Sequence, residues 1–278
     1  MDRLIASNSV ALPQAALAPA AGTPQYATDG NPATNTPATI WPAYQYNAIQ
    51  EELMAVILAA GITPDKANWA QLLAAIRTLA RGGISVVTGS GNFTVPTGIT
   101  VLDVELWGGG AGSFAAYSGV WSGGGAAGGY ARKRITGLTP GQVIAVTIGG
   151  GGAAGTTPGA SWPGAGGTTS FGGWFSATGG SLNGLANPTT NVNFGGGPGG
   201  IGSGGDVNIR GSSGSPGITN WPGMGGAAPG GGSMGSGTTG VAGIFPGGGA
   251  AGAGFTNNDG VNAYAGAAGA AGLCIVRW

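Results

Sequence analysis

Apolar residues begin to recur at helical spacing only after residue 42. Residues 1–42 contain six prolines and no such period, so they are expected to form an extended arm. Pro42 suits the first turn of a helix, because the N–H that proline lacks would have no partner there. Gly61 is suited to end that helix, whose apolar face comprises Ile49, Leu53, Val56, Ile57 and Ala60.

A second helix is predicted directly after the first. Residues 63–65 combine a capping threonine, a proline and an acid, which is a typical helix start. Two glycines at 82–83 end this helix, and its apolar stripe is formed by Trp69, Leu72, Leu73, Ile76 and Leu79. The short connection at 61–63 predicts an antiparallel hairpin. No further helix is predicted that would cover the two stripes, which favours contacts in an oligomer over packing within one chain.

From residue 84 the apolar period changes to two, which is typical of strands with one buried face. A proline and a glycine at 140–141 fit a tight turn between two such strands. The clearest strand segments are 101–107, 130–135, 143–148 and 273–278.

Glycine dominates the chain between these strands. Of the 64 glycines, 56 lie in residues 108–278, where large apolar side chains are sparse. Such a segment cannot build an ordinary apolar core. Nine acids balance nine bases, so charge repulsion cannot hold the chain open, and it must order through its backbone or aggregate. The blocks of consecutive glycine are 108–110, 123–125, 149–152, 195–197, 230–232 and 247–249.

The glycine pattern excludes two common uses of this residue. Collagen needs glycine at every third position, and repeated Gly-Gly pairs break that frame. Flexible linkers avoid the Trp, Phe and Ile that recur between the blocks. A left-handed helix with three residues per turn remains, in which packed runs pair one another's N–H and C=O groups. We therefore expect a mixed fold with an extended arm (1–42), a helical hairpin for oligomerisation (43–82) and a β-strand-framed domain with a polyglycine II-like bundle (83–278).

Residues that commonly carry out catalysis are scarce. The chain has no histidine and one cysteine, Cys274, which excludes Ser-His and Cys-His nucleophiles, histidine metal sites and thiolate cages. Asp103 and Glu105 share one strand face and are more typical of a solvated surface than of a catalytic pair. No predicted helix follows a glycine block, as a phosphate-binding loop requires. Zero net charge disfavours nucleic acid as a partner, and we expect no enzyme, metal or cofactor.

The segments between the glycine blocks combine large aromatic side chains with Asn, Ser and Thr. This combination is typical of recognition surfaces, because rigid aromatics supply contact area and amides supply adaptable hydrogen bonds. Plugging of the bundle ends by the same aromatics is the alternative. The residues expected to bind a receptor are Tyr117, Trp121, Trp162, Asn191, Asn193, Phe194, Asn220, Trp221, Met224, Phe245, Phe255, Asn257, Asn258 and Tyr264.

Two parts of the chain resemble the tail fibres of tailed bacteriophages. Similarity to the N-terminal module of such fibres is carried by residues 26–34 (YATDGNPAT), 47–53 (NAIQEEL), 59–64 (AAGITP) and 71–76 (QLLAAI). Similarity to the glycine-rich domain at fibre tips is carried by residues 93–96 (FTVP), 104–110 (VELWGGG), 128–131 (GGYA), 140–142 (PGQ) and the apolar C-terminal strand. Residues 41–44 (WPAY) depart from the usual helix start of the family.

The resemblance implies a homotrimeric phage tail fibre or adhesin that belongs to the virion and is extracellular on release. Residues 1–42 are then expected to attach to a tail or baseplate protein. The distal loops are expected to bind a host cell-surface polysaccharide or outer-membrane protein. A purely structural glycine-rich tail component, whose loops only seal the bundle, is the alternative. An ice- or surface-binding protein is disfavoured by the irregular aromatic loops.

Overall fold

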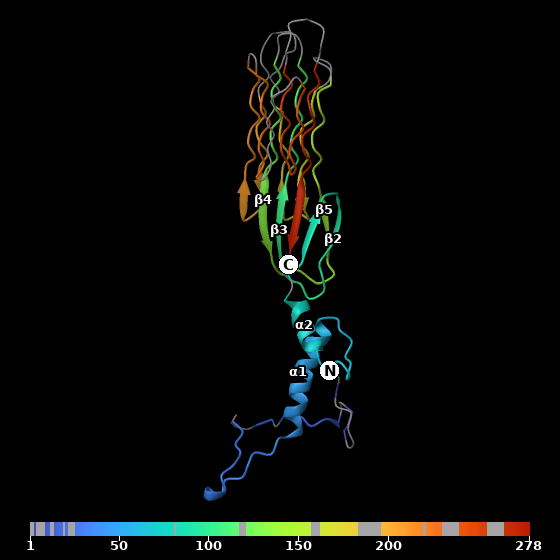
Figure 1. The fold of residues 1–278 in the computed structure, drawn as a ribbon, viewed down its shortest axis with the longest axis vertical. Helices are drawn as coiled ribbons and strands as arrows, with labels where there is room; N and C mark the ends of the chain where they lie inside the picture. The colour runs from blue at the N-terminus through green and yellow to red at the C-terminus, as the bar shows by residue number, and fades with distance from the viewer. Residues whose placement is uncertain are drawn as a thin grey trace. The chain divides into compact units, whose positions relative to one another are not determined.

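A computed structural model shows two compact units, Met1–Gly82 and Gly83–Trp278 (Figure 1). Neither α-helix of the described chain has the length and apolar character needed to cross a membrane. The residues that the structure describes are 3, 9–11, 14–18, 20–21, 26–80, 82–116, 121–156, 162–182, 196–218, 221–229, 239–254 and 264–278.

The first unit contains two α-helices, α1 (Ala43–Ala59) and α2 (Gln71–Leu79), and a short 3-10 helix at Pro32–Thr34. As expected, α1 begins directly after Pro42 and ends just before Gly61, which has a φ of +71° that favours glycine. The two helices pack against each other.

The predicted start of the second helix at residues 63–65 is wrong, because α2 begins at Gln71. Two side chains hold the intervening residues in turns. Asp65 and Asn68 each accept a hydrogen bond from the backbone N–H two residues later, at 2.9 Å. Such local bonds offer the backbone an alternative to a helix. The connection between the helices therefore comprises residues 60–70 rather than the short link predicted.

The second unit is built on two antiparallel five-stranded sheets. The strand order of the first is β1 (Ile84–Val87), β10 (Leu273–Arg277), β3 (Leu102–Trp107), β4 (Tyr130–Ile135) and β9 (Val207–Ile209). The order of the second is β2 (Gly91–Thr94), β5 (Val143–Thr147), β6 (Thr169–Phe171), β7 (Phe175–Ala177) and β8 (Gly202–Ser203). The mixed fold class, with helices followed by a β-rich domain, is confirmed.

The apolar core of this unit is small and is formed by side chains from both sheets. Alternate residues of β3 are buried, as the period of two predicted. Cys274 on β10 is fully buried, and this burial raises the pKa of its thiol to about 12. Large residues of this core include Phe93, Leu102, Leu106, Ile144, Phe171 and Phe175.

The glycine-rich segments leave the two sheets as extended runs that lie side by side (Figure 1). The run 108–116 shows how they bond, because its successive N–H groups donate to three different neighbours in rotation. Gly108, Gly109 and Gly110 donate to the runs 121–129, 162–168 and 264–272, and the next three residues repeat that order. This period of three identifies the polyglycine II geometry that the glycine blocks predicted.

The run 108–116 is surrounded on all sides. Its carbonyl groups accept bonds from N–H groups of three further runs, 148–156, 178–182 and 248–254. It therefore has six hydrogen-bonded neighbours, and every one of its residues is buried. Every residue of 122–129 is buried as well. Backbone pairing thus takes the place of a side-chain core, which satisfies the buried polar groups with little large apolar side chain.

Close approach, not unusual dihedral angles, explains the need for glycine within the runs. Among described residues, the glycines with positive φ lie at turns, such as Gly141 and Gly247. Inside the runs a Cβ would overlap a neighbouring backbone: at Gly110 it would meet the carbonyl of Gly248. At Gly150, on an outer run, a Cβ would meet nothing within 4 Å.

Candidate functional site at the end of the glycine bundle

Described side chains lie at the end of the bundle away from the sheets, where two pairs of residues are joined by backbone hydrogen bonds. In the first pair, Ala116 and Tyr264 at the ends of two neighbouring runs exchange backbone hydrogen bonds of 2.8 and 2.9 Å. In the second pair, Ile218 and Trp221 exchange backbone hydrogen bonds of 3.0 and 2.9 Å. At about 3.1 Å per residue, the nine residues of 108–116 place this end about 28 Å from the sheets.

Phe114 and Trp162 form an aromatic pair near this end. Their ring centroids are 5.6 Å apart and the rings meet edge to face. Phe114 is 8% exposed, whereas Trp162 is 52% exposed. The pair therefore combines both functions considered for the aromatics: Phe114 fills the bundle, and Trp162 presents a face to solvent.

The paired residues Ile218 and Trp221 belong to a second apolar group. Trp221 is 66% exposed, and Ile218 and Met224 are exposed beside it. The backbone of Met224 is fixed to Ser215 by two bonds, from its N–H to Ser215 Oγ and from the Ser215 N–H to its carbonyl. The exposed side chains thus stand on a backbone that is hydrogen-bonded into the bundle. Ile218 is not among the predicted receptor residues, although it lies two residues before Asn220 in the sequence.

Phe245 lies at the opposite end of the bundle from these residues. Gly247, two residues later, donates to Ala271 and accepts from Gly128, and both of these lie within two residues of a sheet strand. The run 239–247 therefore turns back beside the sheets, where Phe245 is 49% exposed. The structure does not bring Phe245 together with the other predicted receptor residues.

The other predicted receptor residues are only partly described. Trp121 and Tyr264 are half-buried at the far end of the bundle. The remaining residues lie outside the part of the chain that the structure describes, and they are Tyr117, Asn191, Asn193, Phe194, Asn220, Phe255, Asn257 and Asn258.

Charged side chains of the second unit gather on the sheets. Arg132 forms a bidentate ion pair with Asp103, at 2.7 and 2.8 Å, and this bond lowers the pKa of the Asp103 carboxyl. Glu105 is largely buried and pairs with Arg277 at 3.1 Å. The two carboxylates therefore belong to ion pairs between strands, not to the simple solvated face that was expected. Within the described residues, no group of three or more His, Cys, Asp or Glu side chains could hold a metal.

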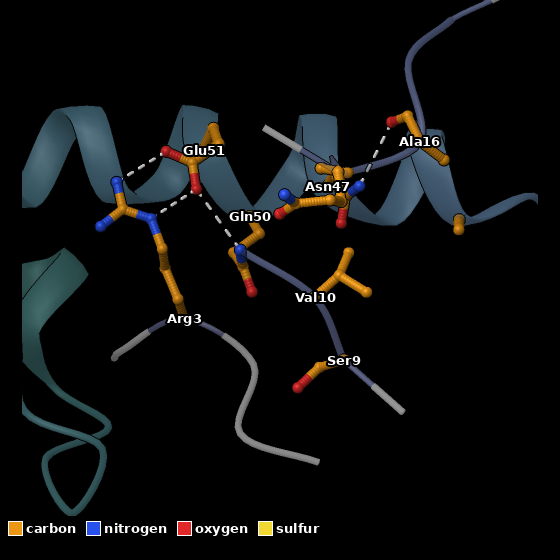
Figure 2. Close-up of a pocket in the computed structure, with 10 residues that line it drawn as sticks. Arg3, Ser9, Val10, Ala16, Asn47, Gln50 and Glu51 are labelled. Atoms are coloured by element: carbon orange, nitrogen blue, oxygen red, sulfur yellow. Dashed lines mark hydrogen bonds and ion pairs between the residues drawn. The ribbon is translucent and has the colours of Figure 1, made fainter. Parts of the chain in front are cut away.

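The first unit has a pocket that the sequence did not predict, where the N-terminal arm lies along α1 (Figure 2). Its volume is about 360 Å³. Arg3 and Glu51 face each other there in a bidentate ion pair of 2.7 and 2.8 Å, which lowers the pKa of Glu51. Asn47 also donates to the carbonyl of Ala16 at 3.3 Å. These contacts fasten the arm to the helix.

Comparison with known proteins identifies the second unit alone. No curated protein matches the sequence. Residues 85–278, which are more than half of the chain, match the family described as a glycine-rich domain. The match covers both sheets and the bundle between β3 and β10. The chain therefore belongs to the glycine-rich domain family.

Proposed function

We propose that the protein is a phage tail fibre or adhesin that binds a host cell-surface receptor with the far end of its glycine bundle, without catalysis. The observation that carries this proposal is the exposure of Trp162 and Trp221 on backbone that the bundle holds in place. Exposed tryptophans on a rigid support are suited to binding, because little side-chain entropy is lost when a partner covers them.

The distribution of charge supports binding at this end. All described charged residues of the second unit lie on β3, β4 and β10 or beside β9, so the described runs carry no charge. The run walls present glycine and alanine for most of their length, which offers a partner few distinguishing groups. Selectivity is therefore assigned to the end, where large aromatic side chains appear.

The N-terminal arm has features that suit attachment of the first unit to another protein. Residues 28–39 form a loop closed on itself, in which Thr39 donates to the Thr28 carbonyl at 2.9 Å and Asn31 bridges to Thr36. The loop buries none of its own side chains, while Tyr26 and Trp41 beside it are exposed. An ordered loop with exposed aromatics at its base suits docking to a tail or baseplate protein, as the resemblance of this module implies.

The alternative is a purely structural tail component, and Phe114 favours it, because this aromatic is buried in the bundle end rather than presented. Adsorption of the purified full chain to bacterial cells separates the two functions. We expect saturable binding to the cells of one host and reduced infection of that host by its phage. A chain that fails to adsorb to any strain that the phage infects would leave the structural function in place of the receptor-binding one.

A further inference from the structure

One side of the glycine bundle differs from the walls of glycine and alanine. It is formed by the neighbouring runs 211–218 and 221–229, whose backbones are hydrogen-bonded to each other at three levels. The side chains of the two runs therefore follow one another in step along the bundle. From the far end towards the sheets, the bonded pairs are Ile218 with Trp221, Ser215 with Met224, and Ser212 with Ala227. These six residues are called the side strip.

Every third residue of the run 221–229 faces solvent. Trp221, Met224 and Ala227 are exposed, whereas two of the glycines between them are buried. Three is the period of the polyglycine II helix, so the exposed side chains form one column along the bundle. Six residues at about 3.1 Å each make this column about 19 Å long. The exposed apolar surface at the far end thus continues down the side of the bundle.

The side chains of the side strip are mostly apolar. Trp221 is 66% exposed, Ile218 55% and Met224 50%. The hydroxyl of Ser215 already accepts a hydrogen bond from the Met224 N–H at 2.6 Å, which uses part of its bonding capacity. Tryptophan and methionine are enriched at protein interfaces, where the flexible methionine fits irregular apolar surfaces. The strip therefore offers a partner apolar contact rather than hydrogen bonds.

The absence of charge on the side strip indicates the kind of partner. Residues 211–272 contain one charged residue, Asp259, and Arg210 precedes them directly after β9. A surface without cations lacks the charged donors that bind the carboxylate or phosphate groups of an anionic polysaccharide. A neutral sugar chain would bury hydroxyl groups against side chains that offer few hydrogen bonds, which is unfavourable. Apolar side chains of a protein fit the strip with neither penalty.

We propose that the receptor contact extends from the far end of the bundle along the side strip, and that the partner there is an uncharged, apolar segment of a cell-surface protein. This inference rests on the proposed function, which assigns binding to the end of the bundle alone. It adds Ile218 and Ala227 to the contact. It also selects one of the two receptor classes that the resemblance to tail fibres leaves open.

Adsorption of the fluorescently labelled full chain to host cells measures the contact along the side strip. We expect Ala227→Lys to weaken adsorption at least tenfold, because it places a charge where an apolar segment packs. Ala227 is exposed and its Cβ is already accommodated, so the variant is expected to melt like the parent.

Ala165→Lys is the matched control. Ala165 is also an exposed alanine, and it lies four residues before β6, whereas Ala227 is bonded to a residue three positions after β9. The two alanines are therefore at similar distances from the sheets. The run 162–168 that carries Ala165 has no described hydrogen bond to either run of the side strip. We expect this variant to adsorb like the parent.

Treatment of the cells identifies the class of the partner. Digestion of surface proteins with a protease is expected to abolish adsorption of the parent chain, and periodate oxidation of surface sugars is expected to leave it unchanged. Parental adsorption of Ala227→Lys, or an equal loss in Ala165→Lys, would overturn the contact along the side strip. Loss of adsorption after periodate alone would overturn the protein partner. These outcomes leave the proposed function in place, whereas a parent chain that adsorbs to no host would overturn both.

Discussion

Alanine at both Trp162 and Trp221 is expected to abolish adsorption to host cells while the thermal stability of the protein hardly changes. Both side chains are more than half exposed, so they contribute little to the packing of the bundle. Truncation of a tryptophan hot spot typically costs about 2 kcal/mol or more of binding energy, which is about thirtyfold in affinity. The lost edge-to-face contact of Trp162 with Phe114 costs only about 0.5 to 1.5 kcal/mol of stability.

Phe245→Ala is the matched control for this pair. Phe245 is 49% exposed, close to the 52% of Trp162, but it lies at the end of the bundle beside the sheets. We expect the Phe245 variant to adsorb like the parent. Binding of fluorescently labelled protein to whole cells, measured beside thermal melting, separates the outcomes. If the Trp162 and Trp221 double variant adsorbed like the parent, the receptor site would lie elsewhere. If the Phe245 variant lost as much adsorption as the double variant, receptor binding could not be assigned to the end of the bundle away from the sheets.

Alanine at Gly110 is expected to reduce the free energy of unfolding of the glycine-rich unit by more than about 3 kcal/mol. Its Cβ would overlap the Gly248 carbonyl, and the obstacle is backbone, which cannot move aside as a flexible side chain can. Overpacking of a well-packed core costs about 1 to 3 kcal/mol, and the cost is higher where relaxation is blocked. Valine at Gly196, where a Cβ would meet the Gly214 carbonyl, is expected to have an effect of the same kind.

Gly150→Ala serves as the control within the same kind of sequence. Gly150 lies in an unbroken block of four glycines, but its Cβ position is open and its φ is not in the left-handed region. The substitution is expected to change stability by no more than about 0.5 kcal/mol. Denaturant melts of the parent and the two alanine variants measure the difference. Equal melting of the Gly110 and Gly150 variants would mean that the runs are not packed against one another.

The longer strands β3, β4, β5 and β10 and the first helix could be predicted from local pattern alone, whereas the short strands β6 to β9 were not predicted. Alternation over 101–107 anticipates β3, and Pro42 with Gly61 bounds α1 closely. The second helix was placed too early because the sequence at residues 63–65 resembles a helix start. The backbone N–H groups that donate to Asp65 and Asn68 hold these residues in turns and delay the helix start. A residue pattern does not contain the geometry on which these hydrogen bonds depend.

The glycine blocks predict the bundle but not the position of each residue within it. Gly110 and Gly150 both lie inside consecutive glycines, yet one is enclosed by six runs and the other faces solvent. Phe245 and Trp221 likewise lie in similar aromatic loops, yet they occupy opposite ends. Each such difference depends on the order in which the runs are laid side by side, and this order arises from contacts between residues far apart in the chain.

Residue-resolved amide hydrogen exchange of the run 148–156 tests most directly whether a backbone-bonded glycine bundle holds the binding end in place. The N–H groups of Gly149, Gly152 and Gly155 donate to Thr169 Oγ1 and to the carbonyls of Gly110 and Ser113, whereas Gly151 and Ala153 have no acceptor among the described residues. We therefore predict slow exchange at every third residue, with fast exchange between. Uniformly fast exchange, as in a linker, or slow exchange at every second residue, as in a strand, would contradict the bundle.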